Sequence, residues 1–230
     1  MAKLKKQVFG EISGALGSVI FRDYKGTNVA SMRPSNINIP NDPSALARRA
    51  RFTLAAKLAK AIRQSREIKL SWVFNTPSNL TTHSYMVQVN YPFVSDTTIS
   101  DYFRLVPEKD FIASVSSFEI REVEVVVRIN ELQGNTGINT SVEKDIRLYS
   151  VFFLSNPTNP ELAPYLFLSV ESNARTLNLN EQLDFVMPLS DLDKQLLNSG
   201  YQTRKAFIVA ITLDETDKPV NYSDKIIYNL

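Results

Sequence analysis

The sequence has no cysteine, a single histidine, His83, and a single tryptophan, Trp72. Without cysteine the chain forms no disulfide and binds no metal through thiolates. This composition suits a cytosolic protein or an assembled particle. A histidine-rich metal site is excluded, and a Ser-His-Asp triad would have to be built on His83. No nucleophile-elbow pattern surrounds that residue, so we expect His83 on a loop or at the surface.

Long apolar runs are also missing. No segment approaches the roughly 20 apolar residues of a membrane span. The first residues, MAKLKKQVFGEISGALG, are basic but lack the continuous apolar stretch of a signal peptide. We therefore expect a soluble chain with no cleaved signal and no membrane partner.

The chain lacks recognisable catalytic and cofactor motifs. Gly10, Gly14 and Gly17 match neither the dinucleotide-binding pattern nor the P-loop. Acidic residues pair at 191/193 and cluster at 214–217, where a helix start and a hairpin turn are expected, and no EF-hand spacing is present. We predict no catalytic residue, no cofactor and no metal, and hence a protein that is not an enzyme.

Charge is distributed unevenly. Residues 1–66 contain 13 basic and 3 acidic residues, a net charge of +10, and the remainder carries −8. The total of +2 therefore hides a basic front joined to an acidic body, which indicates two surfaces with different tasks.

Residues 1–42 are expected to form a glycine-rich basic arm with a hairpin and a linker. Gly14, Gly17 and Gly26 shape this arm, because glycine tolerates positive φ. Residues 19–21 and 28–32 read as two strands around a turn at 23–26. An isolated hairpin is marginal in water, so it must pack on the body or on a partner. Residues 34–42 form a polar linker with two prolines.

An amphipathic helix is predicted over residues 43–66, with Asp42 as N-cap and Pro43 as the first helical residue. Its apolar ridge recurs every four residues, at Leu46, Ala50, Leu54, Leu58 and Ile62. Basic residues lie opposite the ridge, at Arg49, Lys60 and Arg63, and flank it, at Arg51 and Lys57. These cations either contact phosphate or an acidic protein surface, or form a solvated face while the ridge packs on the body.

The remaining chain divides into a connecting layer, which completes the helical region 43–110, and a β-rich domain over 111–230. In the layer, residues 84–91 fit either strand or helix. Alternation over 121–132 places Val123, Val125, Val127 and Ile129 on one face of a strand. Further strands are expected at 146–154, 166–170, 176–179, 183–187 and 225–228, with a short helix at 189–198. Residues 206–213 are apolar on both faces, which indicates a central strand. The predicted fold is α+β: a hairpin arm and an amphipathic helix, followed by an antiparallel, immunoglobulin-like β-sandwich.

Four short motifs occur along the front of the chain: G-x-x-G-x-V (residues 14–19), K-G (25–26), R-P (33–34) and R-x-x-F (49–52). Together they resemble the signature of an uncharacterised family of proteins from Bacteroidota and their phages. Tyr24 stands at the aromatic position before the K-G pair, and Met32 departs from the usual polar neighbourhood of Arg33. The family has no established enzymatic activity. The resemblance implies a phage or prophage context and a structural role.

Taken together, these features predict a non-enzymatic virion component of a tailed phage: a head, connector, tail or decoration protein, made in the cytoplasm of the host bacterium. Its partners are other copies of itself, as a homo-oligomer, and other virion proteins. The predicted contact residues are Arg22, Lys25, Arg33, Arg48, Arg49 and Arg51.

Two alternatives remain open. One is a β-sandwich module that binds carbohydrate or protein through loops such as 156–164. The other is a non-specific nucleic-acid-associated protein that uses the basic front. The front has few aromatic residues for base stacking, namely Phe9, Phe21, Tyr24 and Phe52.

Overall fold

The computed structural model describes residues 2–3, 13–24, 26–35, 39–135 and 137–230. It divides into two compact units, Met1–Asp42 and Pro43–Leu230. The chain is a mixed α+β protein with a β-rich core, and its sheets are antiparallel. Within the described ranges, no helix combines the length and apolar composition that crossing a bilayer requires.

The first unit contains one four-stranded antiparallel sheet in the order β1-β4-β3-β2. Its strands are β1 (Ala2–Lys3), β2 (Gly14–Leu16), β3 (Val19–Tyr24) and β4 (Thr27–Met32). The predicted hairpin is confirmed, since β3 pairs with β4 with Arg22 opposite Val29. Two strands that were not predicted, β1 and β2, extend the hairpin on either side. Gly17 and Gly26 hold the two tight turns at φ of +58° and +73°, which side chains rarely adopt.

A helical layer begins the second unit. It contains α1 (Pro43–Ile62), α2 (Arg66–Asn75) and α3 (Thr82–Asn90), followed by the 3-10 turn η1 (Tyr91–Phe93). Pro43 starts α1 as predicted, but the helix ends at Ile62 instead of Arg66. Ser65 separates the two helices, because its side chain accepts from the Ile68 N–H and caps α2. The ambiguous segment 84–91 is helical and lies mostly in α3.

The predicted ridge on α1 is buried only in its C-terminal half. Leu54, Leu58 and Ile62 have no exposed surface, whereas Leu46 is 51% exposed. Residues four apart advance by about 40° around a helix with 3.6 residues per turn. Over the whole ridge this displacement carries Leu46 away from the face that packs, so the ridge is buried from Leu54 onward and exposed at its start.

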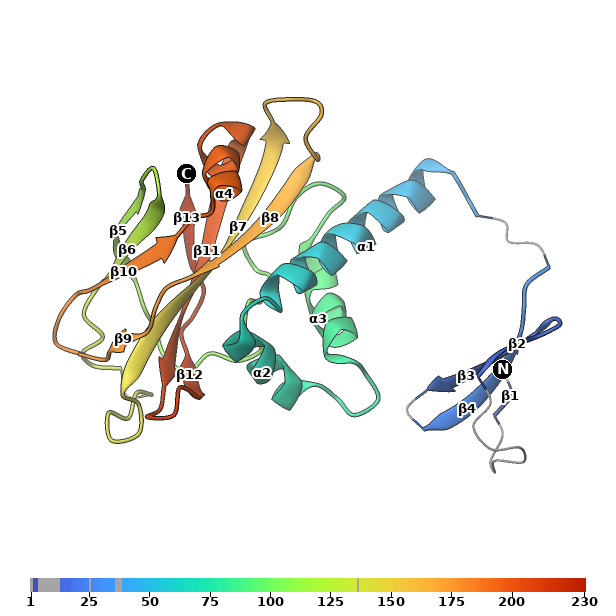
Figure 1. Cartoon of the computed structure of the whole chain (residues 1–230), viewed down its shortest axis with the longest axis horizontal. Coiled ribbons are helices and arrows are strands. Elements are labelled where there is room, and N and C mark those ends of the chain that lie inside the picture. Colours follow the sequence, from blue (N-terminus) through green and yellow to red (C-terminus); the bar gives the residue numbers. More distant parts are fainter. Residues whose placement is uncertain (1, 4–12, 25, 36–38, 136) are drawn as a thin grey trace. The chain divides into compact units, whose positions relative to one another are not determined.

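The rest of the second unit is built from two antiparallel sheets (Figure 1). The small sheet has the order β10-β6-β5, from β5 (Val115–Ile120), β6 (Glu124–Ile129) and β10 (Leu183–Pro188). The large sheet centres on β7 (Asp145–Pro157) and β11 (Tyr201–Leu213). Beside β7 lie β8 (Tyr165–Glu171) and β9 (Arg175–Thr176), and beside β11 lie β12 (Pro219–Tyr222) and β13 (Ile226–Asn229). The helix α4 (Asp191–Gln195) and the π-helical turn η2 (Leu196–Gly200) connect β10 to β11.

The predicted strands are found with changed boundaries. Residues 206–213 are central, since β11 pairs with β7 on one side and with β12 and β13 on the other. Val125, Val127 and Ile129 are fully buried as their alternation predicted, but Val123 precedes β6 and is 56% exposed. Of the strand predicted at 176–179, only the pair Arg175–Thr176 forms. The helix predicted over 189–198 becomes α4 followed by the π-helical turn.

The large sheet is the middle layer of the second unit, with one apolar cluster on each face. Phe153 and Val209 belong to the cluster shared with the helices. Phe152 and Ile208, one residue earlier on the same strands, belong to the cluster shared with the small sheet. Successive strand residues point to opposite faces, so β7 and β11 contribute to both layers.

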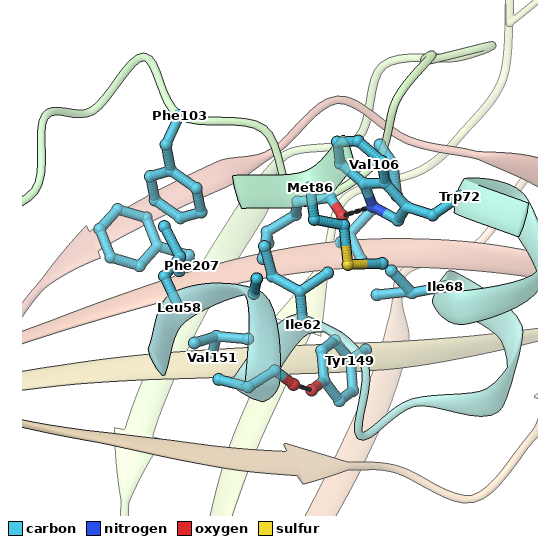
Figure 2. Packing of buried hydrophobic residues seen from close by; sticks show 14 of the residues in the cluster. Leu58, Ile62, Ile68, Trp72, Met86, Phe103, Val106, Tyr149, Val151 and Phe207 are labelled. Carbon is cyan, nitrogen blue, oxygen red and sulfur yellow. Dashed lines mark hydrogen bonds between the residues drawn. The ribbon is translucent and has the colours of Figure 1, made fainter. Parts of the chain in front are cut away.

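Two buried hydrogen bonds fix the helical layer (Figure 2). The Trp72 indole N–H donates to the Leu105 carbonyl across 2.8 Å, which ties α2 to the loop before β5. The Tyr149 hydroxyl donates to the Ala61 carbonyl across 2.5 Å, which ties β7 to the end of α1. Around these bonds the side chains of Ile62 and Met86 fill the space between helices and sheet. The end of α1 is therefore held rigidly on the sheet.

Candidate functional site

The predicted contact residues are divided between the two units. Arg22 and Arg33 lie exposed in the first unit, on β3 and just after β4. Lys25 lies outside the described residues. Of the arm-shaping glycines, Gly14 begins β2 with φ of +115°, and Gly17 and Gly26 occupy turns. The other predicted contact residues are on α1 in the second unit: Arg48, Arg49 and Arg51.

The three arginines of α1 have different surroundings. Arg48 is exposed and donates to the Ser44 hydroxyl, and Arg49 is exposed one position further along. Arg48 and Arg49 bond within α1, whereas Arg51 bonds to a distant part of the chain. Its guanidinium donates to the carbonyls of Tyr91 and Pro92, and its Cζ atom lies 4.3 Å from the centre of the Tyr91 ring. Arg51 therefore joins α1 to the end of α3.

A groove lies beside this junction, between α1 and α3. It consists of two adjoining hollows that share Phe52 and His83, of about 670 Å³ and 420 Å³. We call this the α1–α3 groove. Its apolar lining comes from α1, from α3 and from the residue that follows α3: Phe52, Ala56, Val87 and Tyr91. Phe52 is 57% exposed, so its ring forms an apolar wall open to solvent.

One side of the α1–α3 groove is cationic. Lys57, Lys60 and Arg63 line it and are exposed. Residues 43–63 contain six basic residues and no acidic one. Within the described residues, none of these three cations forms an ion pair. The Lys57 ammonium lies 4.7 Å from the centre of the Tyr165 ring on β8, so its position is set by packing on the large sheet.

His83 lies on the opposite wall, on α3, and is half-buried. Of the expected loop or surface position, His83 has the surface one, since it lines an open groove, but it lies on a helix and not on a loop. Its Nδ1 atom is buried and has no hydrogen-bond partner among the described residues. Burial, and then the positive charge of Arg63, lower the pKa of His83 below its ordinary value. The lowered pKa favours the neutral imidazole. In the part of the chain that the structure describes, no Asp, Glu, Lys or Arg lines the groove on the α3 side, whereas the α1 side is cationic.

A hollow of about 470 Å³, separate from the groove, lies around the loop 101–109 and is lined in part by Lys225. The Lys225 ammonium donates to the carbonyls of Asp101 and Phe103 and lies 4.0 Å from the centre of the Phe103 ring. Burial lowers the pKa of Lys225 to about 8, against the opposing charges of Asp101 and Asp224. These contacts attach the loop to β13, and they engage the amine in structure.

The acidic groups considered in the sequence occupy a cap and a turn. The Asp193 carboxylate accepts from Ser190 in a capping box at the start of α4, and Asp191 pairs with Lys194. The Asp214 carboxylate accepts from the backbone N–H groups of Thr216 and Lys218, which closes the turn before β12. In the part of the chain that the structure describes, no group of three or more His, Cys, Asp or Glu residues is arranged to hold a metal ion.

The α1–α3 groove was not predicted as a site. Its residues come from segments about 30 positions apart, and the sequence left 84–91 undecided between strand and helix. The signal that pointed to it was Phe52, an aromatic residue among the cations of the predicted helix. Only the cationic side of the groove follows from the sequence.

No protein-family model matches the chain, and no curated protein matches it. Among solved structures, a selenomethionine-labelled β-glucosidase from Kluyveromyces marxianus shares 10% sequence identity at a TM-score of 0.21. The match covers 60% of this chain and 19% of the β-glucosidase chain, so the chain spans about a fifth of that protein's length. A likeness at this level carries no argument about fold or activity.

Proposed function

We propose that the chain is a non-enzymatic structural protein of a tailed-phage virion, a head, connector, tail or decoration component, which assembles through residues 1–42 and through α1. One observation carries the proposal. The four-stranded sheet of the first unit has no buried residue among those described. Its apolar side chains are half-buried at Val19, Ile20 and Phe21, and exposed at Leu16 and Met32. A small sheet needs a packed face to be stable, so this unit fits a protein that completes its core against a partner.

The phage context rests on the resemblance of residues 14–52. The glycines of that signature are consistent with it, because Gly14, Gly17 and Gly26 all have positive φ. Such positions favour glycine for its backbone conformation, which gives a physical reason for glycine in the pattern. The structural role is supported further by the exposed cations of α1, which suit contact with an acidic protein surface.

The proposal includes an immunoglobulin-like topology for the two sheets of the second unit. In that fold, the second strand lies between the first and fifth, and the sixth strand lies between the third and seventh. Here β6 lies between β5 and β10, and β11 lies between β7 and the pair β12 and β13. Taking β5 as the first strand, β10 corresponds to the fifth and β11 to the sixth. The additional strand β8 pairs with β7.

Light scattering coupled to size exclusion tests the assembly role. The full chain is compared with a chain that begins at Pro43, each over a range of concentrations. We expect the full chain to form oligomers and the shortened chain to form particles with fewer copies, because the unpacked sheet is removed. Identical monomeric behaviour of both chains at high concentration would refute self-assembly through residues 1–42. Binding of DNA by the full chain with a steep salt dependence would favour the nucleic-acid alternative.

A further inference from the structure

The second unit carries a surface that is complementary to the α1–α3 groove. This surface lies on the opposite side of the unit from the groove. The groove belongs to the helical layer, on one face of the large sheet. The small sheet and η2, which follows α4, cover the other face, since Phe185 of β10 and Leu197 of η2 belong to the second apolar cluster. Figure 1 shows the helices α1–α3 and the strands β5, β6 and β10 on opposite sides of β7 and β11.

This complementary surface lies where β6 and α4 begin. The Leu189 N–H donates to the Val123 carbonyl across 3.0 Å and brings the two starts together. Val123 and Leu192 are 56% and 64% exposed, so two aliphatic side chains stand out from one corner. We call it the acidic corner, and it consists of Glu122, Val123, Glu124, Asp191, Leu192 and Asp193.

The acidic corner keeps an excess of negative charge. Among the described residues, its four carboxylates form ion pairs with two cations, and one of these, Arg121, also pairs with Glu119. Arg121 lies 3.4 Å from Glu124, and Lys194 lies 2.7 Å from Asp191. The Asp191 side chain is 95% exposed despite this pairing, so it is free to face a second cation. The corner thus combines exposed aliphatic groups with carboxylates.

We propose that the α1–α3 groove of one copy binds the acidic corner of a second copy of this chain. Leu192 and Val123 pack against the Phe52 wall, and the carboxylates that flank them face Lys60 and Arg63. Charge complementarity of this kind selects the partner and its orientation. The proposal rests on the assembly role proposed above, and it places a contact in the second unit, independent of residues 1–42.

The positions of the two surfaces determine the form of the assembly. Each copy uses its groove toward one neighbour and its acidic corner toward another, because the surfaces lie on opposite outer layers. Such a contact is heterologous, and it repeats into a closed ring or an open filament instead of stopping at a two-fold dimer. A chain with one of its two surfaces disabled is still able to bind through the other.

Mixing variants of the full chain tests this arrangement. Lys60→Glu with Arg63→Glu disables the groove, and Asp191→Lys with Leu192→Ser disables the corner. The altered side chains are exposed or line the open groove, and the folded state is checked by circular dichroism. Lys218→Glu with Arg104→Glu is the matched control, since both cations are exposed on other loops. Sedimentation at about 0.1 M salt, where charges act over roughly 10 Å, gives the masses.

We expect wild-type and control chains to form assemblies larger than dimers. Each disabled variant alone should associate at least about tenfold more weakly, since like charges then face each other. An equimolar mixture of the two disabled variants should associate more strongly than either variant alone but form smaller assemblies than wild type, because each pair of chains regains one competent groove–corner interface. Self-association of either variant at the wild-type strength, a mixture that associates no more strongly than the separate variants, or a monomeric wild-type chain would each overturn the proposal.

The same measurements separate this inference from the assembly role of residues 1–42. If the chain that begins at Pro43 loses association while the groove variant keeps it, the contact through the first unit stands and the groove contact fails. If the groove variant loses association while the shortened chain keeps it, the groove contact stands and assembly through residues 1–42 fails.

Discussion

Arg147 Nη1 donates to Glu67 Oε1 across 2.8 Å and joins β7 to the start of α2. The two side chains are only 22% and 9% exposed. The second carboxylate oxygen of Glu67 accepts from the Ser65 hydroxyl, and the Glu67 carbonyl accepts from the Tyr222 hydroxyl. Every one of these bonds crosses from the helical layer to the sheet or caps the helix. The pair therefore anchors the start of α2 on the large sheet.

Glu67→Ala should destabilise the protein by about 2–4 kcal/mol, because it removes the ion-pair partner of the largely buried Arg147. The Glu171 carboxyl, which also interacts with the Arg147 charge, remains in the variant. The Nε atom of Arg147 already lacks a hydrogen-bond partner among the described residues. Glu119→Ala is the matched control, since Glu119 pairs with Arg121 at the surface, and it should change the free energy of unfolding by no more than about 0.5 kcal/mol. Urea denaturation measures both. Equal losses in the two variants would show that the buried pair has no special role.

Trp72→Phe should also cost about 2–4 kcal/mol. The smaller ring leaves unfilled volume at a fully buried position. The Leu105 carbonyl also loses its hydrogen bond from the indole N–H. Tyr102→Phe serves for comparison, because Tyr102 is 79% exposed and its change should be near neutral. Thermal unfolding followed by circular dichroism gives the difference. An unchanged midpoint for Trp72→Phe would contradict the packing described for α2.

The β-rich half of the fold and α1 were largely predictable from the sequence, and the rest of the helical layer was not. Alternation identified β6, and an unbroken apolar run identified β11 as central, because both patterns follow directly from which faces are buried. Over 67–110 the elements are short, and their helical form is settled by caps at Ser65 and Thr81 and by packing on the sheet. The exposed Leu46 shows the same limit, since the neighbouring Ala45 is buried and only tertiary packing decides which face of α1 is covered.

The cations of the candidate site were visible in the sequence, and the site itself was not. A run without acidic residues marked α1 as basic, but the partners of each cation depend on tertiary contacts. Arg51 was predicted to contact a partner and bonds to η1 within the chain, whereas Lys60 and Arg63 line the groove. The opposite wall comes from α3, and no local pattern pairs His83 with Phe52. Only folding brings these residues together.

His83 gives a clean test of the groove's electrostatics, because it is the only histidine. Its pKa, measured by NMR titration, should lie below 6.5. Arg63→Gln should raise that pKa by removing the nearby positive charge, without restoring it fully, since burial is the larger cause. Arg48→Gln is the control, because Arg48 lies near the start of α1, about 22 Å from Arg63 along the helix axis at 1.5 Å per residue. This variant should leave the titration of His83 unchanged. Equal shifts in both variants would contradict the placement of Arg63 beside His83.

Lys225 should make stability depend on pH in the alkaline range. Its pKa is lowered to about 8 in the folded protein, from 10.5, so between these values the unfolded chain binds more protons than the folded one. The free energy of unfolding contributed by this group therefore rises as pH increases from 8 to about 10.5, and the cost of burying the charge is fully present below pH 8. Lys225→Met removes the titration.

The difference in unfolding free energy between wild type and Lys225→Met isolates this effect, because the tyrosines titrate in both proteins and cancel. We expect the difference to shift in favour of wild type between pH 7.5 and pH 10. Lys218→Met is the matched control, since Lys218 is exposed, and its difference from wild type should stay constant over the same range. A difference for Lys225→Met that stays flat or moves in the opposite direction would mean that the ammonium is not buried against Phe103.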